Sequence, residues 1–313
     1  MPRTPNPPRA NAADPPEAEQ AVLGARDGDA GAGAGGSQHL GEVLHYYRSW
    51  ESRLLYRFLG GTKHYGLFRP GDASWDVWSA MRRMEDLLAQ KLGLAAGARA
   101  LDAGCGVGDV ACRLAEVHGL HVTGIDVQQP DIKEARRRAS RRRLTDSLHF
   151  QQMDYAALTF PDASFDGAYS METLVHSDRV EDVLAELYRV LRPGGRLVHF
   201  EYSRSPKDST SPHDEAFLTQ INQIAAMPAF QRLEHGVLER LLSEAGFVDV
   251  ESEDITARML PMLKLFAAAG WLPYRLGAAL GRSHLVVNSM AGVEFYLHRN
   301  CWRYNTYTCR KPT

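Results

Sequence analysis

The pattern of apolar and polar positions changes near residue 97. Residues 39–96 carry apolar side chains at helical spacing, whereas short apolar runs alternate with amphipathic helical stretches farther along. HVTGIDV (121–127) and FDGAYSM (165–171) are typical of strands. Strands that alternate with helices form a parallel sheet covered on both faces, because each crossover is right-handed. The pattern therefore predicts an α/β core over residues 97–313, preceded by a helical cap.

The two ends of the chain depart from this alternation. Residues 1–38 are rich in Pro, Ala, Gly and Asp and have few apolar side chains, which predicts a disordered tail. The aromatic segment VEFYLHRNCWRYNTYTCRK (293–311) alternates, which predicts a final strand or hairpin. The most apolar segment, residues 259–274, is too short to span a membrane and is interrupted by Pro261 and Pro273.

Charge and cysteine content narrow the class of protein. Lys and Arg number 36 and Asp and Glu 38, giving a formal net charge of −2, whereas nucleic-acid-binding proteins usually have a basic excess. The four cysteines, Cys105, Cys112, Cys301 and Cys309, form no CxxC motif, which predicts reduced thiols and no metal site. The chain shows neither a signal-peptide pattern nor a transmembrane segment, so we expect a cytoplasmic protein.

ALDAGCGVGDVA (100–111) is the sharpest chemical signal. A strand leads into Asp102, three glycines follow at alternate positions, and a helical pattern begins after them. Glycine lets the backbone turn tightly and approach a ligand closely. The dinucleotide spacing GxGxxG is not met, because position 109 is Asp. A second acid, Asp126, ends the next strand, where it can accept hydrogen bonds from ribose hydroxyls.

With these features the chain resembles the class I S-adenosylmethionine-dependent methyltransferases over roughly residues 40–313. MDY (153–155) and AELYRVLRPGGRLV (185–198) agree with that family's third strand end and fifth strand. The resemblance implies a doubly wound, mostly parallel seven-stranded sheet of order 3-2-1-4-5-7-6 with strand 7 antiparallel, and S-adenosyl-L-methionine as cofactor. The cofactor-binding residues that it implies are Asp102, Gly104, Cys105, Gly106, Gly108, Asp126, Val127, Asp154, Tyr155 and Met171.

Within this family the chain resembles the sterol 24-C-methyltransferases and the methyltransferases of small natural products. ETLVH (172–176) matches a Glu-x-x-x-His stretch after the fourth strand of the sterol enzymes, and HYG (64–66) precedes the core. The resemblance implies Glu172, His176 and His64 as catalytic residues near the transferable methyl group. The segment YRFLGGTKHYGLF (56–68) lacks the Trp-Gly of the sterol enzymes. This favours another lipophilic acceptor, methylated at N, O or C.

Several alternatives stay open. Glu172 and His176 are alternatively polar residues at an ordinary strand end. The protein is alternatively a sterol 24-C-methyltransferase or a non-catalytic, cofactor-binding regulator. The helix KEARRRASRRR (133–143) is either an RNA-binding element of an RNA methyltransferase or a solvated helix face, and the near-neutral charge favours the solvated face.

Residues 205–285 are expected to form a lid over the cofactor, together with the N-terminal helices. An enclosed site excludes water and positions the acceptor. The expected partners are a lipophilic small-molecule acceptor and, transiently, a membrane surface, with no nucleic acid. Six apolar residues are candidates for an acceptor pocket or, alternatively, for core packing: Phe217, Met227, Phe230, Met262, Phe266 and Trp271.

Overall fold

The computed structural model describes residues 64–73, 75–281 and 286–313 of the 313-residue chain. The predicted tail over residues 1–38 and residues 39–63 of the predicted helical cap lie outside the described residues. Both therefore stay predictions. The last part of the expected cap is present as helix α3 (Val77–Leu92).

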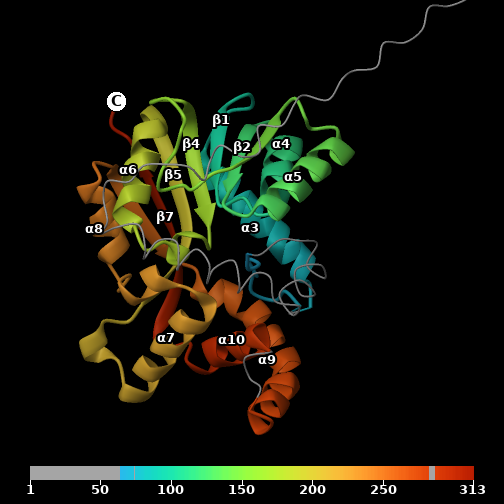
Figure 1. Ribbon diagram of the computed structural model, residues 1–313, viewed down its shortest axis with the longest axis vertical. Coiled ribbons are helices and arrows are strands. Elements are labelled where there is room, and N and C mark those ends of the chain that lie inside the picture. Colours follow the sequence, from blue (N-terminus) through green and yellow to red (C-terminus); the bar gives the residue numbers. More distant parts are fainter. Residues whose placement is uncertain (1–63, 74, 282–285) are drawn as a thin grey trace, which may run out of the picture.

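A seven-stranded sheet forms the centre of the molecule, in the predicted order β3-β2-β1-β4-β5-β7-β6 (Figure 1). Neighbouring strands are parallel except that β7 runs antiparallel to β5 and β6. The strands are β1 (Arg99–Ala103), β2 (His121–Asp126), β3 (Leu148–Gln152), β4 (Phe165–Met171), β5 (Leu191–Arg204), β6 (Val248–Asp254) and β7 (Trp302–Arg310). The predicted fold class is confirmed.

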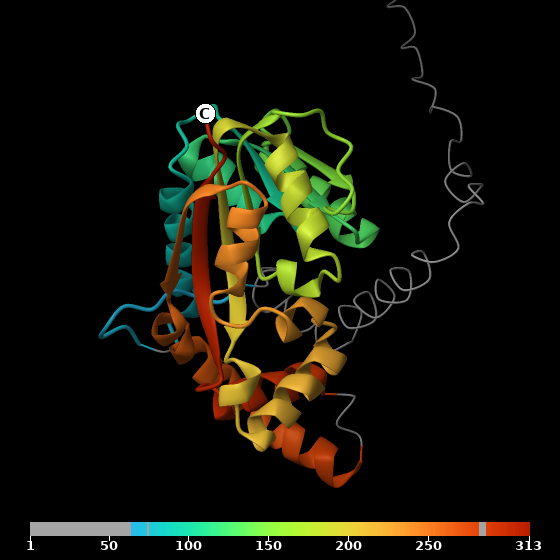
Figure 2. The same cartoon turned by 90° about the vertical axis from the view of Figure 1, so that its left-hand side faces the viewer.

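Helices cover the sheet and extend beyond one of its ends. Figure 1 shows α4 and α5 beside β1 and β2, and α6 and α8 beside β5 and β7. Helices α7, α9 and α10 gather beyond the carboxyl ends of the parallel strands, where sheets of this type bind ligands (Figures 1 and 2). After α3 the helices are α4 (Asp109–His118), α5 (Gln129–Arg142), α6 (Val180–Val190), α7 (Pro212–Ala225), α8 (Val237–Glu244), α9 (Thr256–Ala279) and α10 (Val287–Leu297).

The arginine-rich helix α5 is fastened to its neighbours. Arg142 and Arg138 pair with Asp109 at 2.7 and 3.4 Å, and Arg136 donates a hydrogen bond to the Phe150 carbonyl. The apolar side chains of the helix are buried against the sheet. Several of the positive charges of α5 are therefore paired with groups of the protein itself.

One expectation about the C-terminal part was wrong. The alternation that predicted a strand from residue 293 belongs partly to α10, so strand β7 begins only at Trp302. Residues 287–297 form a helix rather than a strand because this segment packs tightly on α9. A Cβ atom at Gly270 of α9 would lie 2.9 Å from the Cα atom of Ser289 of α10. Helix α9 runs through Pro261 and Pro273 without a break. None of the helices within the described ranges combines the length and apolar character needed to cross a bilayer.

Candidate active site

The glycine-rich loop between β1 and α4 shows two different uses of glycine. Gly104 has φ +92°, and a Cβ atom there would lie 2.5 Å from Thr173 Cγ2, in the loop after β4. Gly106 has φ +51°, but a Cβ atom there would meet no described atom within 4 Å. One glycine therefore lets the β4 loop approach closely. The other leaves open space where a ligand can approach the backbone.

Asp102, at the end of β1, is a buried carboxylate with a missing partner. Its Oδ2 atom has no hydrogen-bond partner in the described part of the chain. Burial raises the pKa of Asp102 to about 7; the nearby Tyr169 hydroxyl opposes the rise, and the Asp126 carboxylate adds to it. Buried polar atoms are normally paired, so an unpaired one calls for a bound group. A positively charged group, such as the ammonium of S-adenosyl-L-methionine, fits this position.

Asp126, at the end of β2, shapes the same loop. Its Oδ2 accepts a hydrogen bond from the Gly106 N–H at 2.9 Å, and its Oδ1 accepts one from the Gln128 N–H at 2.8 Å. Next to it, the Val127 carbonyl accepts a bond from Gln152 Nε2. The acid predicted to hold the ribose thus also fixes the loop that bends around the open space at Gly106.

The other predicted cofactor residues lie around this edge in different roles. The backbone N–H groups of Gly104 and Cys105 both donate to the Ile125 carbonyl at 2.9 Å, and burial raises the pKa of the Cys105 thiol. Asp154 is exposed and pairs with Arg179 at 2.8 Å. The Tyr155 hydroxyl donates to the Thr173 carbonyl at 2.9 Å, which joins the loops after β3 and β4.

The last two lie at the loop ends. Gly108, with φ +74°, precedes helix α4. Met171 is the half-buried last residue of β4 and pairs with Phe200 of β5. Met171 therefore leads the chain directly into Glu172, at the carboxyl edge of the sheet.

Glu172 is held in an unusual way. Its φ is +58°, a region that costs a non-glycine residue about 1–3 kcal/mol. Its carboxylate accepts three hydrogen bonds: from the Tyr65 N–H at 2.9 Å, the Tyr202 hydroxyl at 2.7 Å and the Tyr304 hydroxyl at 2.8 Å. Burial raises the pKa of Glu172 above its ordinary value, and these donors oppose the rise. The three hydrogen bonds hold the Glu172 side chain in one position despite the strained backbone.

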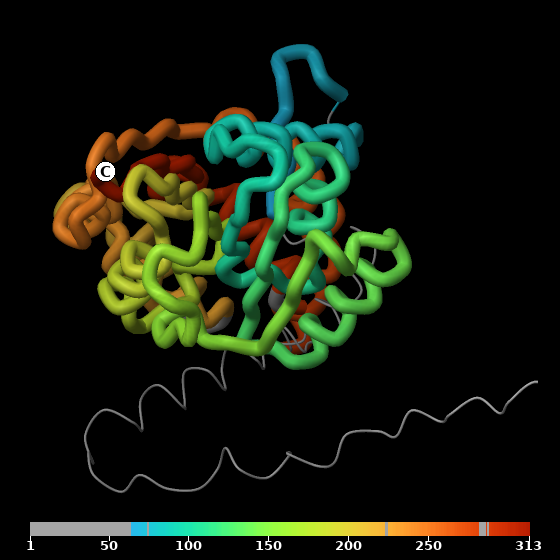
Figure 3. Tube along the Cα trace, turned by 90° about the horizontal axis from the view of Figure 1, so that it is seen from above, coloured from blue at the N-terminus to red at the C-terminus, as the bar shows by residue number. Residues whose placement is uncertain are grey.

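The loop His64-Tyr65-Gly66 runs past this carboxylate. The Gly66 N–H donates to Met262 Sδ at 3.1 Å, which ties the loop to α9. The His64 ring is buried, with Nδ1 2.8 Å from the Tyr65 carbonyl and Nε2 3.4 Å from Glu85 Oε1. Burial lowers the pKa of His64, but the Glu85 carboxylate, with the Tyr65 carbonyl and the Glu172 carboxylate, outweighs burial and raises the pKa overall. Figure 3 shows the chain after this loop standing out from the body before it enters α3.

His176 lies in a short 3₁₀ turn, η1 (Leu174–His176), and faces the helices beyond the sheet. Its Nδ1 is 2.8 Å from the Ala226 carbonyl, which caps the C-terminus of α7. A carbonyl only accepts, so Nδ1 carries the hydrogen and Nε2 is the lone-pair nitrogen of the neutral ring. The structure brings His64 and Glu172 to one neighbourhood and connects His176 to α7.

Three residues of this site were missed by the sequence analysis: Glu201, Tyr202 and Tyr304. Glu201 is fully buried and accepts hydrogen bonds from the N–H groups of Val175 and Tyr202. Burial raises the pKa of Glu201 to about 8, so this acid is largely neutral at pH 7. A charged residue inside the buried strand segment HFEY (199–202) was the available signal. Tyr304 follows 132 residues after Glu172, and its sequence context gives no signal.

The apolar residues predicted to line the acceptor pocket separate into groups. Met262 contacts the HYG loop through Gly66, and the half-buried Phe266 packs against Tyr65 with ring centroids 6.2 Å apart. Phe217 and Phe230 are buried against Phe295 of α10. Met227 is also buried, whereas Trp271 is 56% exposed on α9. In the described structure, Trp271 is therefore a surface residue.

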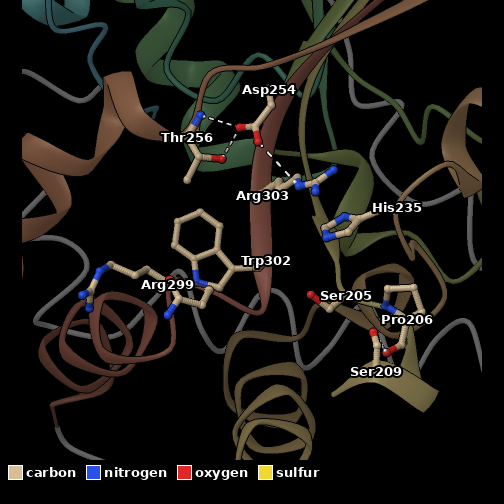
Figure 4. A pocket seen from close by; sticks show the side chains of 10 residues that line it. Ser205, Pro206, Ser209, His235, Asp254, Thr256, Arg299, Trp302 and Arg303 are labelled. Carbon is tan, nitrogen blue, oxygen red and sulfur yellow. Dashed lines mark hydrogen bonds and ion pairs between the residues drawn. The ribbon is translucent and has the colours of Figure 1, made fainter. Parts of the chain in front are cut away.

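A separate polar pocket of about 420 Å³ lies where β5 and β6 end and β7 begins (Figure 4). In Figure 4 Asp254 is joined to Thr256 and Arg303 by the dashed contacts, with His235 opposite. Its lining is hydroxyl-bearing and charged, including Ser205, Ser209 and Arg299. Such a lining does not suit the lipophilic acceptor expected from the sequence.

The comparisons with known proteins agree with this geometry. A family model described as a methyltransferase domain matches residues 101–199. The S-adenosyl-L-methionine-dependent Diels-Alderase iccD of Talaromyces variabilis is 40% identical over 274 residues, covering 85% of this chain and 94% of the relative. The O-methyltransferase cnsE of Penicillium expansum is 33% identical and covers 74% and 80%, respectively.

A solved structure extends the likeness to three dimensions. The crystal structure of the 4+2 cyclase SpnF has a TM-score of 0.70 with this chain at 28% identity, covering 88% of this chain and 96% of that one. The sheet order is the one expected of this family, and the glycine loop leaves open space beside its backbone at Gly106. The chain belongs to the class I S-adenosylmethionine-dependent methyltransferases.

Proposed function

We propose that the protein transfers a methyl group from S-adenosyl-L-methionine to an oxygen, nitrogen or carbon atom of a lipophilic natural product. One observation carries this proposal: Thr173, the neighbour of Glu172, lies against Gly104 of the cofactor loop and donates to the Ala103 carbonyl at 3.0 Å. This contact supports a place for Glu172 in a loop that would border the methyl donor. The named O-methyltransferase relative supports the same reaction.

The cofactor side of the proposal rests on three residues. Asp102 would hold the ammonium group, Asp126 the ribose, and the backbone at Gly106 would allow close approach. When bound, S-adenosyl-L-methionine supplies an electrophilic methyl group on a sulfonium. The chain's own contribution is then to bind, orient and exclude water, which accounts for much of the rate in an enclosed site.

On the acceptor side, methylation of O or N requires a proton to leave the acceptor. We assign His176 as the group that accepts this proton. Its Nδ1 donates to the Ala226 carbonyl, so its Nε2 is the basic nitrogen. The Glu172 carboxylate accepts three hydrogen bonds, one of them from the HYG loop. We therefore assign Glu172 the role of holding that loop in position. His64, buried beside Glu85, would border the methyl group and help to fix that loop.

A second reaction on the same site is a 4+2 cyclisation in which the cofactor is bound but not consumed. Two observations favour it. The relative with 40% identity is named as a Diels-Alderase and is matched over 94% of its length. A cycloaddition also needs no proton acceptor, which agrees with a Glu172 carboxylate already engaged by three donors.

One experiment separates the two reactions. Metabolites of the producing cell are compared by mass spectrometry with and without the protein, and candidate acceptors are then incubated with the purified protein and S-adenosyl-L-methionine. Methyl transfer gives a product one CH₂ heavier together with S-adenosylhomocysteine. Cyclisation gives an isomer of unchanged mass and no S-adenosylhomocysteine. If no compound changes in either way, both proposals are wrong and the non-catalytic alternative is supported.

The remaining alternatives have weaker support. A sterol 24-C-methyltransferase is disfavoured by the missing Trp-Gly in residues 56–68. A cytoplasmic location is supported by four cysteines that are all free thiols. Transient contact with a membrane surface remains part of the proposal, supported by exposed Trp271, Leu272 and Leu276 on α9.

A further inference from the structure

Four polar side chains meet where the N-terminus of α7 faces the C-terminal end of α10. His213 and Asp214 belong to the first turn of α7. Glu294 lies in the last turn of α10, and His298 follows four residues later on the same helix face. One ligand atom each from His213, Asp214 and His298 lies within 4.8 Å of the other two. Histidine nitrogens and carboxylate oxygens converge here outside the cofactor edge.

The ring of His298 is held rigidly at the centre of this cluster. It is 7% exposed and stacks on Phe217, with ring centroids 4.3 Å apart and an angle of 7° between the planes. Its Nδ1 lies 2.6 Å from Asp214 Oδ1, and its Nε2 lies 3.5 Å from Glu294 Oε2. The His213 ring lies 4.7 Å from the His298 ring. The position of one ligand nitrogen is thus fixed before any ion binds.

Hydroxyl groups orient both carboxylates from outside. The Ser211 hydroxyl donates to Asp214 Oδ2 at 2.7 Å, so Oδ1 is turned toward His298. The Tyr274 hydroxyl donates to Glu294 Oε1 at 2.6 Å, so Oε2 is turned toward the other nitrogen of the same ring. Outer hydrogen bonds of this kind set the tautomer and direction of metal-binding groups in proteins.

We propose that His213, Asp214 and His298 bind one divalent transition-metal ion of the zinc type. Two imidazole nitrogens and one carboxylate oxygen suit zinc, whereas magnesium and calcium prefer oxygen ligands throughout. The ion binds His298 Nδ1 in place of the hydrogen that faces Asp214 Oδ1, and that hydrogen moves to Nε2. Glu294 stays outside the ligand set and accepts the hydrogen of His298 Nε2.

The bound ion would fasten α7 to α10, across 84 residues of sequence. This connection reaches the active site, because the Ala226 carbonyl at the other end of α7 accepts the hydrogen of His176 Nδ1. The cluster escaped the sequence analysis because its ligands come from two distant helices rather than from a local spacing. The proposal does not depend on which reaction the active site performs.

Zinc binding is tested with the untagged full-length protein after treatment with EDTA and dialysis. Zn²⁺ binding is measured by isothermal titration. We expect one ion per chain and a higher melting temperature with the ion bound. Titration with Mg²⁺ is expected to show no binding. Absence of Zn²⁺ binding to the wild-type protein overturns the proposal.

Two variants locate the ion, and a third is the matched control. His213→Ala removes an exposed ring, and Asp214→Asn keeps the shape of the side chain; each is expected to weaken Zn²⁺ binding at least about tenfold. His121→Ala removes an exposed histidine outside the cluster, at the start of β2, and should bind like the wild type. Far-UV circular dichroism without metal checks that each variant is folded. If both cluster variants bind Zn²⁺ as tightly as His121→Ala, the ion lies elsewhere and the proposal is wrong.

Discussion

The cofactor side and the acceptor side of this site are built by different means. Asp102, the glycine loop and Asp126 stand at the ends of two adjacent strands, and backbone turns bring them together. The Glu172 carboxylate instead collects donors that lie 107, 30 and 132 residues away, from Tyr65, Tyr202 and Tyr304. A site made by local turns is visible in the sequence. A site made by tertiary packing is visible only in the fold.

The two acids also differ in how they are satisfied. Asp102 is buried with an oxygen that has no partner in the described chain, which suits a residue that waits for a cationic ligand. Glu172 is buried with three donors already in place, which suits a residue that holds the shape of a pocket. Substitutions at these two positions should therefore affect different measurements.

The largest effect is expected from Gly104→Arg. A side chain at Gly104 collides with Thr173 and takes up the space between the two loops, so we expect no measurable binding of S-adenosyl-L-methionine by calorimetry. The matched control is Gly97→Arg, because Gly97 also has positive φ but open surroundings away from the loop. Normal binding by Gly104→Arg would remove the loop from the cofactor site.

The next effect is expected from Glu172→Gln. A glutamine side chain can keep its oxygen on the Tyr65 N–H and the Tyr304 hydroxyl, but it turns an NH₂ group toward the Tyr202 hydroxyl and carries no negative charge. Product formation should fall about 100-fold, while cofactor affinity changes little. Glu251→Gln, at an exposed position of β6, is the control and should retain full activity. A variant that loses cofactor affinity and activity together would contradict the division between the two sides.

The sequence predicts the proposed cofactor side because its residues follow fixed spacings. The alternation of strands and helices predicted the sheet, and Asp102 to Gly108 predicted the loop. The resemblance to the sterol enzymes proposed Glu172 and His176 but not what they contact, since Ala226, Tyr202 and Tyr304 carry no local signal. The sequence pattern also extended the last strand into α10, because Phe295 and Leu297 alternate in sequence while the helix is fixed by close packing at Gly270.

A smaller, pH-dependent effect is expected from Asp102→Asn. The variant keeps the shape of the side chain but cannot become negative, so affinity for S-adenosyl-L-methionine should fall at least about tenfold at pH 8. At pH 5 the wild-type acid is itself mostly neutral without ligand, because its pKa is about 7, and the difference should shrink. Calorimetry at the two pH values measures this. Equal affinities of wild type and variant at pH 8 would exclude Asp102 as the partner of the ammonium group.

The raised pKa of Asp102 also predicts how the stability of the ligand-free protein depends on pH. The folded pKa of Asp102 is raised above its unfolded value, so the folded state binds more protons and the ligand-free wild type loses stability as pH rises from about 4 through 7. Asp102→Asn avoids this loss. The ligand-free variant should therefore melt several degrees higher than wild type at pH 8 and only slightly higher at pH 5. The opposite trend would mean that another group in the folded chain satisfies Asp102.

The smallest effect is expected from Tyr304→Phe, which removes one of the three donors to Glu172. Loss of one hydrogen bond should cost about 1 kcal/mol of stability. It should also raise the pKa of Glu172 further, because the donors oppose the effect of burial. The acidic limb of the pH–activity profile should then shift to higher pH, with little change in activity at high pH. Tyr296→Phe, on α10, is the matched control and should leave the profile unchanged. A profile that stays in place in Tyr304→Phe would mean that the charge of Glu172 does not matter and that only its position does.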